Sequence, residues 1–176
     1  MGDDRIADEP TTVIITDASV LIDYYTADAR ILSRISRCIG SLVIPRQVFE
    51  EVQQIEEAQA KILGISILDP ELSQFTEASI RGGPLSRADK LILIMARDRG
   101  YTCWTNDSRL RKKCLEEGIQ VFWGLEIMLP LCKGGQLLEK AALRMGRRIR
   151  DINRLYISDE IFALFEKKVR DLFNKK

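Results

Sequence analysis

Carboxylates are the side chains in this sequence whose positions suggest chemistry. Four of them stand out, and these are Asp17, Glu51, Asp89 and Asp107. Asp17 directly follows the β-branched run at residues 13–16, and Asp107 comes just after a second strand-like run at 101–105. Parallel strands end at the same edge of a sheet, where open α/β folds bind their ligands. If these two strands are neighbours, Asp17 and Asp107 face one crevice.

The other two acids belong to predicted helices. Asp89 lies in the first turn of a helix that Ser86 caps and that is apolar almost all round, so this helix is expected to be buried. The helix that begins at Pro45 carries its apolar residues on one face. At about 100° per residue, Glu51 falls on the flank of that face, while Glu50 points away from it. We therefore expect Glu51, rather than Glu50, to join the aspartates.

Each acid also has an ordinary structural role open to it. Asp17 and Asp107 suit helix N-caps, and Asp89 suits the first turn of a helix. Glu51 suits a solvated surface. Gathered at one edge of a sheet, however, these carboxylates would repel one another unless a cation neutralised them. A site of oxygen ligands that keeps some waters favours Mg²⁺ or Mn²⁺.

Other catalytic chemistries lack support in the sequence. There is no histidine, which excludes Ser–His and Cys–His nucleophiles, histidine bases and the usual zinc sites. No Gly-x-Gly-x-x-Gly motif or P-loop occurs, so a Rossmann cofactor site is unsupported. The segment Asp17-Ala18-Ser19 lacks the second aspartate of an Asp-x-Asp phosphohydrolase, and no lysine-bearing strand typical of a receiver domain is obvious.

Strand-like and helix-like segments alternate along the chain with short connections. The predicted strands are residues 13–16, 41–44, 65–68, 101–105 and 119–123. The predicted helices are residues 19–25, 28–38, 45–63, 69–81, 86–99 and 107–117, and the remainder, 124–176, is predicted as helix only. This alternation predicts an α/β protein with three α/β/α layers around a central parallel sheet, followed by C-terminal helices.

The expected organisation has three parts. Residues 1–11 form a flexible tail, residues 12–132 a catalytic domain, and residues 133–176 a helical extension that packs on the domain or on a dimer partner. No apolar run approaches the roughly 20 residues of a membrane span, and no secretory signal is evident. Four cysteines without a Cys-x-x-Cys motif favour buried, reduced thiols in a cytoplasmic protein.

The net charge is only +1, but the basic residues are clustered. One cluster, which includes Arg109, Arg111 and Lys112, follows Asp107, and six bases lie between residues 140 and 154. Such clusters permit contacts with nucleic-acid phosphates, although a charge run is also typical of a solvated helix face. We expect Arg109, Arg111 and Lys112 to contact phosphates beside the acids.

The acids stand in motifs that resemble those of PIN-domain nucleases, in particular VapC-type toxins. The matching segments are Thr16-Asp17-Ala18-Ser19-Val20-Leu21, Pro45-x-x-Val48-x-x-Glu51, Leu85-Ser86-x-x-Asp89 and Thr105-Asn106-Asp107. The resemblance covers about residues 13–123. It implies a metal-dependent endoribonuclease in which all four acids are catalytic and bind Mg²⁺ or Mn²⁺. It also implies secondary roles for Ser19 and Thr105 in holding the acids and the metal waters.

The same resemblance implies RNA as substrate, products with 5′-phosphate and 3′-hydroxyl ends, a homodimer and, for a toxin, a VapB-type antitoxin as partner. Toxins of this type are usually shorter, whereas about fifty residues of predicted helix follow Trp123 here. Two interpretations stay open. One is an active endoribonuclease, and the other is a PIN-fold module that binds RNA or a protein without cutting.

Overall fold

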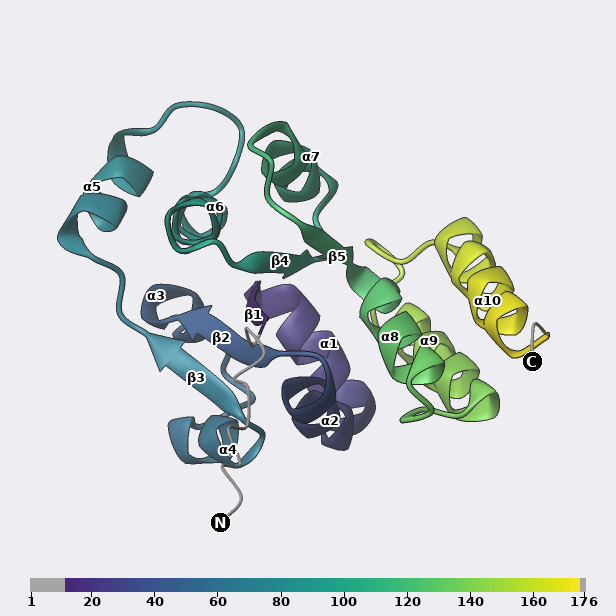
Figure 1. Ribbon diagram of the computed structural model, residues 1–176. Coiled ribbons are helices and arrows are strands. Elements are labelled where there is room, and N and C mark those ends of the chain that lie inside the picture. The colour runs from purple at the N-terminus through teal and green to yellow at the C-terminus, as the bar shows by residue number, and fades with distance from the viewer. Residues whose placement is uncertain (1–11, 175–176) are drawn as a thin grey trace, which may run out of the picture.

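The computed structural model describes residues 12–174, which form a five-stranded, all-parallel sheet between layers of helices (Figure 1). The strands are β1 (Val13–Thr16), β2 (Ser41–Pro45), β3 (Ile65–Leu68), β4 (Thr102–Thr105) and β5 (Val121–Trp123). β1, β2 and β4 are almost entirely buried, as apolar strands covered on both faces must be. The predicted three-layer α/β/α fold is confirmed. The predicted tail at residues 1–11 lies outside the described residues.

Helices connect the strands and cover both faces of the sheet. Before β4 they are α1 (Ala18–Asp28), α2 (Arg30–Cys38), α3 (Arg46–Phe49), α4 (Glu57–Ile62), α5 (Leu72–Ile80) and α6 (Arg87–Arg99). After β4 they are α7 (Ser108–Glu116), the 3-10 turn η1 (Gly124–Ile127), α8 (Met128–Lys133), α9 (Glu139–Ile152) and α10 (Asp159–Asn174). In Figure 1, α5, α6 and α7 lie on one side of the sheet, and α1, α2 and the C-terminal helices lie on the other.

β1 lies in the middle of the sheet, whose strand order is β3-β2-β1-β4-β5. The chain builds outward from β1 to β2 and β3, and then returns through α6 to place β4 on the other side of β1. This reversal leaves a crevice beyond the carboxyl ends of β1 and β4, the position where open α/β sheets bind ligands. Ile15 pairs with Cys103 and Thr16 with Trp104, so the residues that follow these two strands lie side by side.

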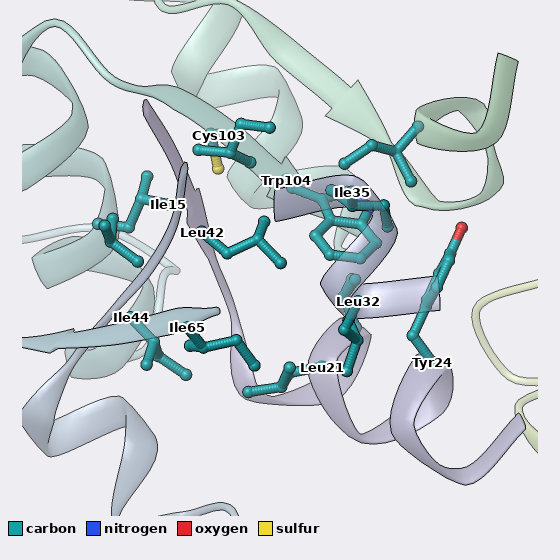
Figure 2. Packing of buried hydrophobic residues seen from close by; sticks show 14 of the residues in the cluster. Ile15, Leu21, Tyr24, Leu32, Ile35, Leu42, Ile44, Ile65, Cys103 and Trp104 are labelled. Carbon is teal, nitrogen blue, oxygen red and sulfur yellow. The ribbon is translucent and has the colours of Figure 1, made fainter. Parts of the chain in front are cut away.

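A buried aromatic pair connects α1, β4 and the segment after β5. Figure 2 shows Tyr24 of α1 beside Trp104 of β4 in this core. The rings of Tyr24 and Trp104 meet edge to face, with centroids 4.7 Å apart. The Tyr24 hydroxyl and the Trp104 indole N–H both donate a hydrogen bond to the carbonyl of Gly124, each 3.0 Å long. Because an unpaired buried donor costs about 1–3 kcal/mol, this shared acceptor holds the start of η1 against α1.

The predicted continuous helix over residues 45–63 is wrong. α3 ends at Phe49, a turn follows, and a separate helix begins at Glu57. Val52 and Ile55 are buried as the apolar pattern predicted, but they reach the core from the turn, in which the Val52 N–H donates to the Phe49 carbonyl at 2.8 Å. Apolar residues spaced three or four apart do not require a helix where the chain folds back on itself.

The cysteines follow the prediction with one exception. Cys103, Cys114 and Cys132 are buried, but Cys38 is exposed, so the prediction of a buried thiol is wrong there. Cys38 is the last residue of α2 and follows the exposed Arg37, so it lies on the outer side of the helix. All four cysteines are free. Among the described residues, no helix combines the length and the apolar character that crossing a membrane requires.

The C-terminal helices share one core with the sheet. α9 packs on α1, and α10 packs on α9 and α8. The apolar side chains of α9 are buried at Ala142, Met145 and Ile149, whereas Ile152 at its end is 43% exposed. The two last helices pack closely at Gly146, where a β-carbon would lie 2.7 Å from Cε1 of Phe165 on α10. The division of the chain at residue 132 stays a prediction.

Replacing Gly146 with alanine is expected to destabilise the protein. In an ordinary helix interior this change stabilises by about 1 kcal/mol, but here the added methyl would collide with Phe165. Overpacking of this kind costs about 1–3 kcal/mol, so the midpoint of thermal unfolding should fall. Lys140→Ala, on the exposed face of the same helix, is the matched control and should leave the midpoint nearly unchanged. A midpoint that rises in Gly146→Ala would contradict the close packing of α9 on α10.

Candidate active site

A cavity of about 140 Å³ lies at the carboxyl edge of the sheet, beyond β1 and β4. Four acids line it, and these are Asp17, Glu51, Asp89 and Asp107. They come from the start of α1, the turn after α3, the first turn of α6 and the start of α7. Ser19, Ser86 and Tyr156 also line the cavity. The fold therefore brings together all four acids that the sequence singled out, while their catalytic and metal-binding roles stay a prediction.

Asp17 is the most buried of the four, with 7% of its surface exposed. Its Oδ1 caps α1 by accepting a hydrogen bond from the Val20 N–H at 2.7 Å, and its Oδ2 accepts one from the Thr105 hydroxyl. Burial raises the pKa of Asp17 to about 6, because these two bonds only partly offset the loss of water and the charge of Asp89 adds to the rise. The Asp17 carboxylate therefore both caps α1 and lines the cavity.

Thr105, the fully buried last residue of β4, connects two of the acids. Its hydroxyl donates to Asp17 and accepts a hydrogen bond from the backbone N–H of Asp107 at 2.9 Å. A hydroxyl has one proton and two lone pairs, so this arrangement directs the single donor at the carboxylate. These contacts support the predicted positioning role of Thr105. Ser19, the other predicted secondary residue, lies at the cavity wall in the first turn of α1.

Asp107 and Asp89 are each tied to the start of a helix. Asp107 caps α7, and its Oδ1 accepts hydrogen bonds from the N–H groups of Arg109 and Leu110 at 2.7 and 2.9 Å. The Ser86 hydroxyl accepts from the Asp89 N–H at 3.0 Å and donates to the Asp89 carboxylate at 2.6 Å. Burial raises the pKa of Asp89, and the charge of Asp107 adds to this rise. The two carboxylates therefore interact across the cavity.

Glu51 lies at the rim of the cavity, in the turn that follows α3. Its backbone N–H donates to the Val48 carbonyl at 3.1 Å, which keeps the turn tight. Its side chain is exposed, unlike that of Asp17. Glu50 is exposed as well but does not line the cavity. The prediction of Glu51 over Glu50 agrees with this placement, although the helix flank on which that prediction rests does not form.

The donor set fits a hard divalent cation. All four acids offer carboxylate oxygens, and of the described residues that line the cavity none is a lysine or arginine. Each carboxylate oxygen has two lone pairs, so the hydrogen bonds described above leave acceptor capacity for an ion or its waters. Within residues 12–174, however, no three acidic, cysteine or histidine side chains already converge as a metal-binding group. The arrangement therefore suits Mg²⁺, which commonly uses one or two carboxylates and keeps several waters.

The predicted phosphate-contacting residues lie on α7, close behind Asp107. Arg109 is exposed in the first turn of this helix. Arg111 stacks on Trp123, with its guanidinium carbon 4.2 Å from the ring centroid. Lys112 has 78% of its side chain exposed. Arg109 is nearest in sequence to the acid that caps the helix, but none of the three bases lines the cavity, so their contact with phosphates stays a prediction.

The part of the basic stretch 140–154 that carries Arg144 and Arg148 lies away from the cavity. Arg144 and Arg148 line a groove of about 230 Å³ between α2 and α9, beside Asp28 at the C-terminal end of α1. The cavity lies at the other end of α1, which has 11 residues, so the groove is about 16 Å away along the helix. Arg144 and Arg148 therefore do not extend the basic surface of α7 around the acids, whereas Arg154, at the other end of the stretch, is two residues from Tyr156, which lines the cavity.

A buried polar cluster that the sequence did not predict lies beside the cavity. Asp23 on α1 is 4% exposed and accepts hydrogen bonds from the side-chain amides of Asn106 at 3.0 Å and Asn153 at 2.8 Å. Burial raises the pKa of Asp23 to about 6 although both amide bonds lower it. Asn106 is visible in the sequence as the neighbour of Asp107, whereas no signal in the sequence pairs Asp23 with a residue after α9. The cluster ties the C-terminal helices to the end of β4.

The comparison with protein families agrees with the fold and the acid motifs. The chain matches the family DUF3368, a PIN domain, over residues 13–171. Because this range covers nearly all of the described residues, the chain belongs to this PIN-domain family, and the predicted resemblance to a PIN-domain nuclease is confirmed at that level. The match continues through α9 and into α10. No curated protein matches the chain. PIN domains are generally nucleases that use divalent metals.

Replacing Asp17 with asparagine is expected to stabilise the fold at neutral pH. The native pKa of about 6 exceeds the 3.8 of an ordinary aspartate, so the folded state binds the proton more tightly than the unfolded state. The favourable contribution of this group is complete below pH 3.8 and is lost as the pH rises through about 6. At neutral pH the buried charge costs up to about 3 kcal/mol, at about 1.36 kcal/mol per pKa unit. Asparagine caps α1 without that cost.

Thermal unfolding as a function of pH tests this expectation. Asp17→Asn should melt above the wild type at neutral pH, and the difference should narrow as the pH falls toward about 4. Asp171→Asn removes an exposed carboxylate from α10 and should show neither effect. If Asp17→Asn melted below the wild type at neutral pH, the ionised carboxylate would be a stabilising group, contrary to the pKa that burial imposes.

Proposed function

We propose that this PIN-domain protein is a metal-dependent endoribonuclease that hydrolyses phosphodiester bonds of RNA. The observation that carries the proposal is the cavity in which four acids from separate elements meet without a lysine or arginine among its described lining residues. Left alone, these charges destabilise the fold, as the raised pKa values of Asp17 and Asp89 indicate. Catalytic sites commonly retain groups that lower the stability of the fold because activity requires them. The destabilising acid cluster therefore supports a catalytic role.

In this proposal the four acids hold one or two Mg²⁺ or Mn²⁺ ions. A divalent ion in such a site lowers the pKa of a bound water and offsets the charge that develops on the attacked phosphate. Asp17 is fixed in orientation by Thr105 and the start of α1, and Asp107 by the start of α7. Water adds to phosphorus, the bond to the 3′ oxygen breaks, and the products carry 5′-phosphate and 3′-hydroxyl ends.

The resemblance to VapC-type toxins supplies the finer parts of the proposal. These are a role as the toxin of a toxin–antitoxin pair, a VapB-type antitoxin as partner, a homodimer and a cytoplasmic location. Arg109, Arg111 and Lys112 are proposed to contact RNA phosphates, and Arg109 is the nearest of them to Asp107 in the sequence.

A binding module without catalytic activity is the second candidate. It is favoured by one observation, namely that no three potential metal ligands among residues 12–174 are already closed around a single point. A module of this kind would hold RNA or a protein at the same edge of the sheet without cutting. Cleavage measured with and without metal separates the two candidates.

Purified protein is expected to cleave a mixed RNA pool in Mg²⁺ or Mn²⁺ and not in EDTA. Asp17→Asn should lower the rate at least about 100-fold, because a proposed metal ligand is lost. Thr105→Val, which removes the hydroxyl that positions Asp17, should lower it about 10- to 100-fold, the range typical of outer-shell partners. Gel analysis of the products and of their 5′ ends measures both effects. Asp171→Asn is the charge-matched control and should cleave like the wild type.

The outcome distinguishes the candidates. Cleavage that persists in EDTA or in Asp17→Asn would contradict the proposed mechanism. RNA binding without cleavage under any metal condition would favour the binding module.

Neutralising Arg109 should weaken RNA binding through loss of a phosphate contact. For single strands, log K falls with log salt by about 0.7 per phosphate contact, so Arg109→Gln should flatten this slope by about 0.7. Binding titrations in EDTA over a range of salt concentrations give the slope. Lys61→Gln is the matched control, because it removes a charge of the same sign from α4. This helix leads into β3 and lies at the opposite edge of the sheet. An unchanged slope in Arg109→Gln would place the RNA elsewhere.

A further inference from the structure

Tyr156 is the one residue of the α9–α10 connection that lines the acid cavity. It shares the wall with Asp17, Glu51 and Asp107 although it lies at least 49 positions from any of them in the sequence. It is also the only aromatic side chain among the described residues of that wall. The C-terminal helices therefore contribute a ring to the site that the sequence motifs alone do not predict.

The connection that carries Tyr156 is fastened on both sides. Before Tyr156, the side-chain amide of Asn153 donates a hydrogen bond to the buried Asp23 at 2.8 Å. After Tyr156, Ile157 is 2% exposed, and its N–H donates a hydrogen bond to the Asn153 carbonyl at 3.0 Å. Ser158 then starts α10 by accepting a hydrogen bond from a backbone N–H of the first turn at 3.3 Å. A residue held between two such anchors presents its side chain in one place, which lowers the entropy cost of binding.

The ring of Tyr156 is left available. The residue is 38% exposed, and within residues 12–174 the structure gives its ring and hydroxyl no hydrogen bond or aromatic contact. Leu155 beside it is 86% exposed but lies outside the cavity wall. A half-exposed tyrosine with an apolar ring and a polar tip, at the rim of an acidic cavity, is typical of a surface that receives a partly apolar, partly polar ligand.

The size of the cavity determines where such a ligand must lie. At about 140 Å³ it is smaller than the roughly 300–1,000 Å³ of pockets that enclose a whole small-molecule ligand. It has room for a phosphate group with an ion and waters, but a nucleotide's sugar and base must stay outside, on the rim. Of the groups at that rim, the acids repel phosphate oxygens in the absence of an ion, and Tyr156 offers the flat apolar face that a nucleobase prefers.

We infer that Tyr156 is a nucleobase platform, on which a base next to the scissile phosphate stacks while the phosphate enters the acid cavity. The inference rests on the proposed nuclease function and adds a substrate-binding residue to it. Stacking is tolerant of base identity, because every base has a π-face. It requires a base that is free to leave a duplex, so the site takes its substrate at an unpaired nucleotide.

The test compares Tyr156→Ala, Tyr156→Phe and Leu155→Ala, using a 5′-fluorescein-labelled single-stranded RNA of mixed sequence. Loss of a stacked base on an aromatic side chain weakens binding about 10-fold or more. Tyr156→Ala should therefore raise KM about 10-fold with little change in kcat. Tyr156→Phe keeps the ring and should stay within about twofold of the wild type. Leu155→Ala removes the neighbouring exposed side chain and should behave like the wild type.

A series of RNAs with one abasic nucleotide each separates stacking from a merely structural role. In the wild type, removal of the base next to the cleaved bond should weaken binding as much as Tyr156→Ala does, and in Tyr156→Ala the same removal should have no further effect. Full additivity of the two losses would overturn the inference. Thermal unfolding midpoints of the variants should match that of the wild type, since the ring is half-exposed and unpartnered.

Binding of the labelled RNA in Ca²⁺, a hard cation that carboxylate oxygens also bind, is followed by fluorescence anisotropy and keeps this test independent of the proposed activity. If the wild type does not cleave but Tyr156→Ala binds about 10-fold more weakly, the nuclease proposal fails and the platform stands. If the wild type cleaves and Tyr156→Ala matches it in KM and in binding, the platform fails and the nuclease proposal stands. Absence of RNA binding by the wild type would overturn the platform as well.

Discussion

The arrangement of the site depends on the hydrogen bonds that the buried carboxylate of Asp17 accepts. This carboxylate lies where β1 ends, at the point where the order of strands reverses. It accepts hydrogen bonds from Thr105 of the neighbouring strand β4 and from Val20 in the first turn of α1. Taking a carboxylate out of water is costly, and burial raises its pKa to about 6. The hydrogen bonds from Thr105 and Val20 reduce this cost without removing it. Because both bonds depend on geometry, β1, β4 and α1 must keep their relative positions around the carboxylate.

The same local chemistry that starts the helices also directs the acids to one edge. Asp17 and Asp107 are N-caps of α1 and α7, and Asp89 lies in the first turn of α6. Helix N-termini carry partial positive charge, which favours carboxylates there. Since strands of a parallel sheet all point the same way, α1 and α7, which directly follow β1 and β4, begin at the carboxyl edge, and α6 begins there because it runs back to the start of β4. The structural and the functional roles of these acids are therefore compatible, and the fold concentrates negative charge at the position where a cation and a phosphate can use it.

The C-terminal helices belong to the site as well as to the core. α9 packs on α1, and Asn153 at its end shares the buried Asp23 with Asn106, the neighbour of Asp107. This cluster fixes the connection that holds Tyr156 at the cavity wall. The family match, which reaches residue 171, is consistent with these helices being part of the working unit.

The sequence by itself determined the fold class and the identity of the acids, because both depend on local patterns. Buried β-branched runs define β1 and β2, and glycines and caps define the ends of most helices. The predicted helix through Val52 and Ile55 is wrong since burial alone does not distinguish a helix from a folded-back turn. Only the tertiary structure decided that β4 lies next to β1, because strand order depends on which pairing buries the most surface. For the same reason it alone joined Asp23 to Asn153 and brought Tyr156 to the acids, since contacts between residues so far apart in the chain follow from packing and not from spacing.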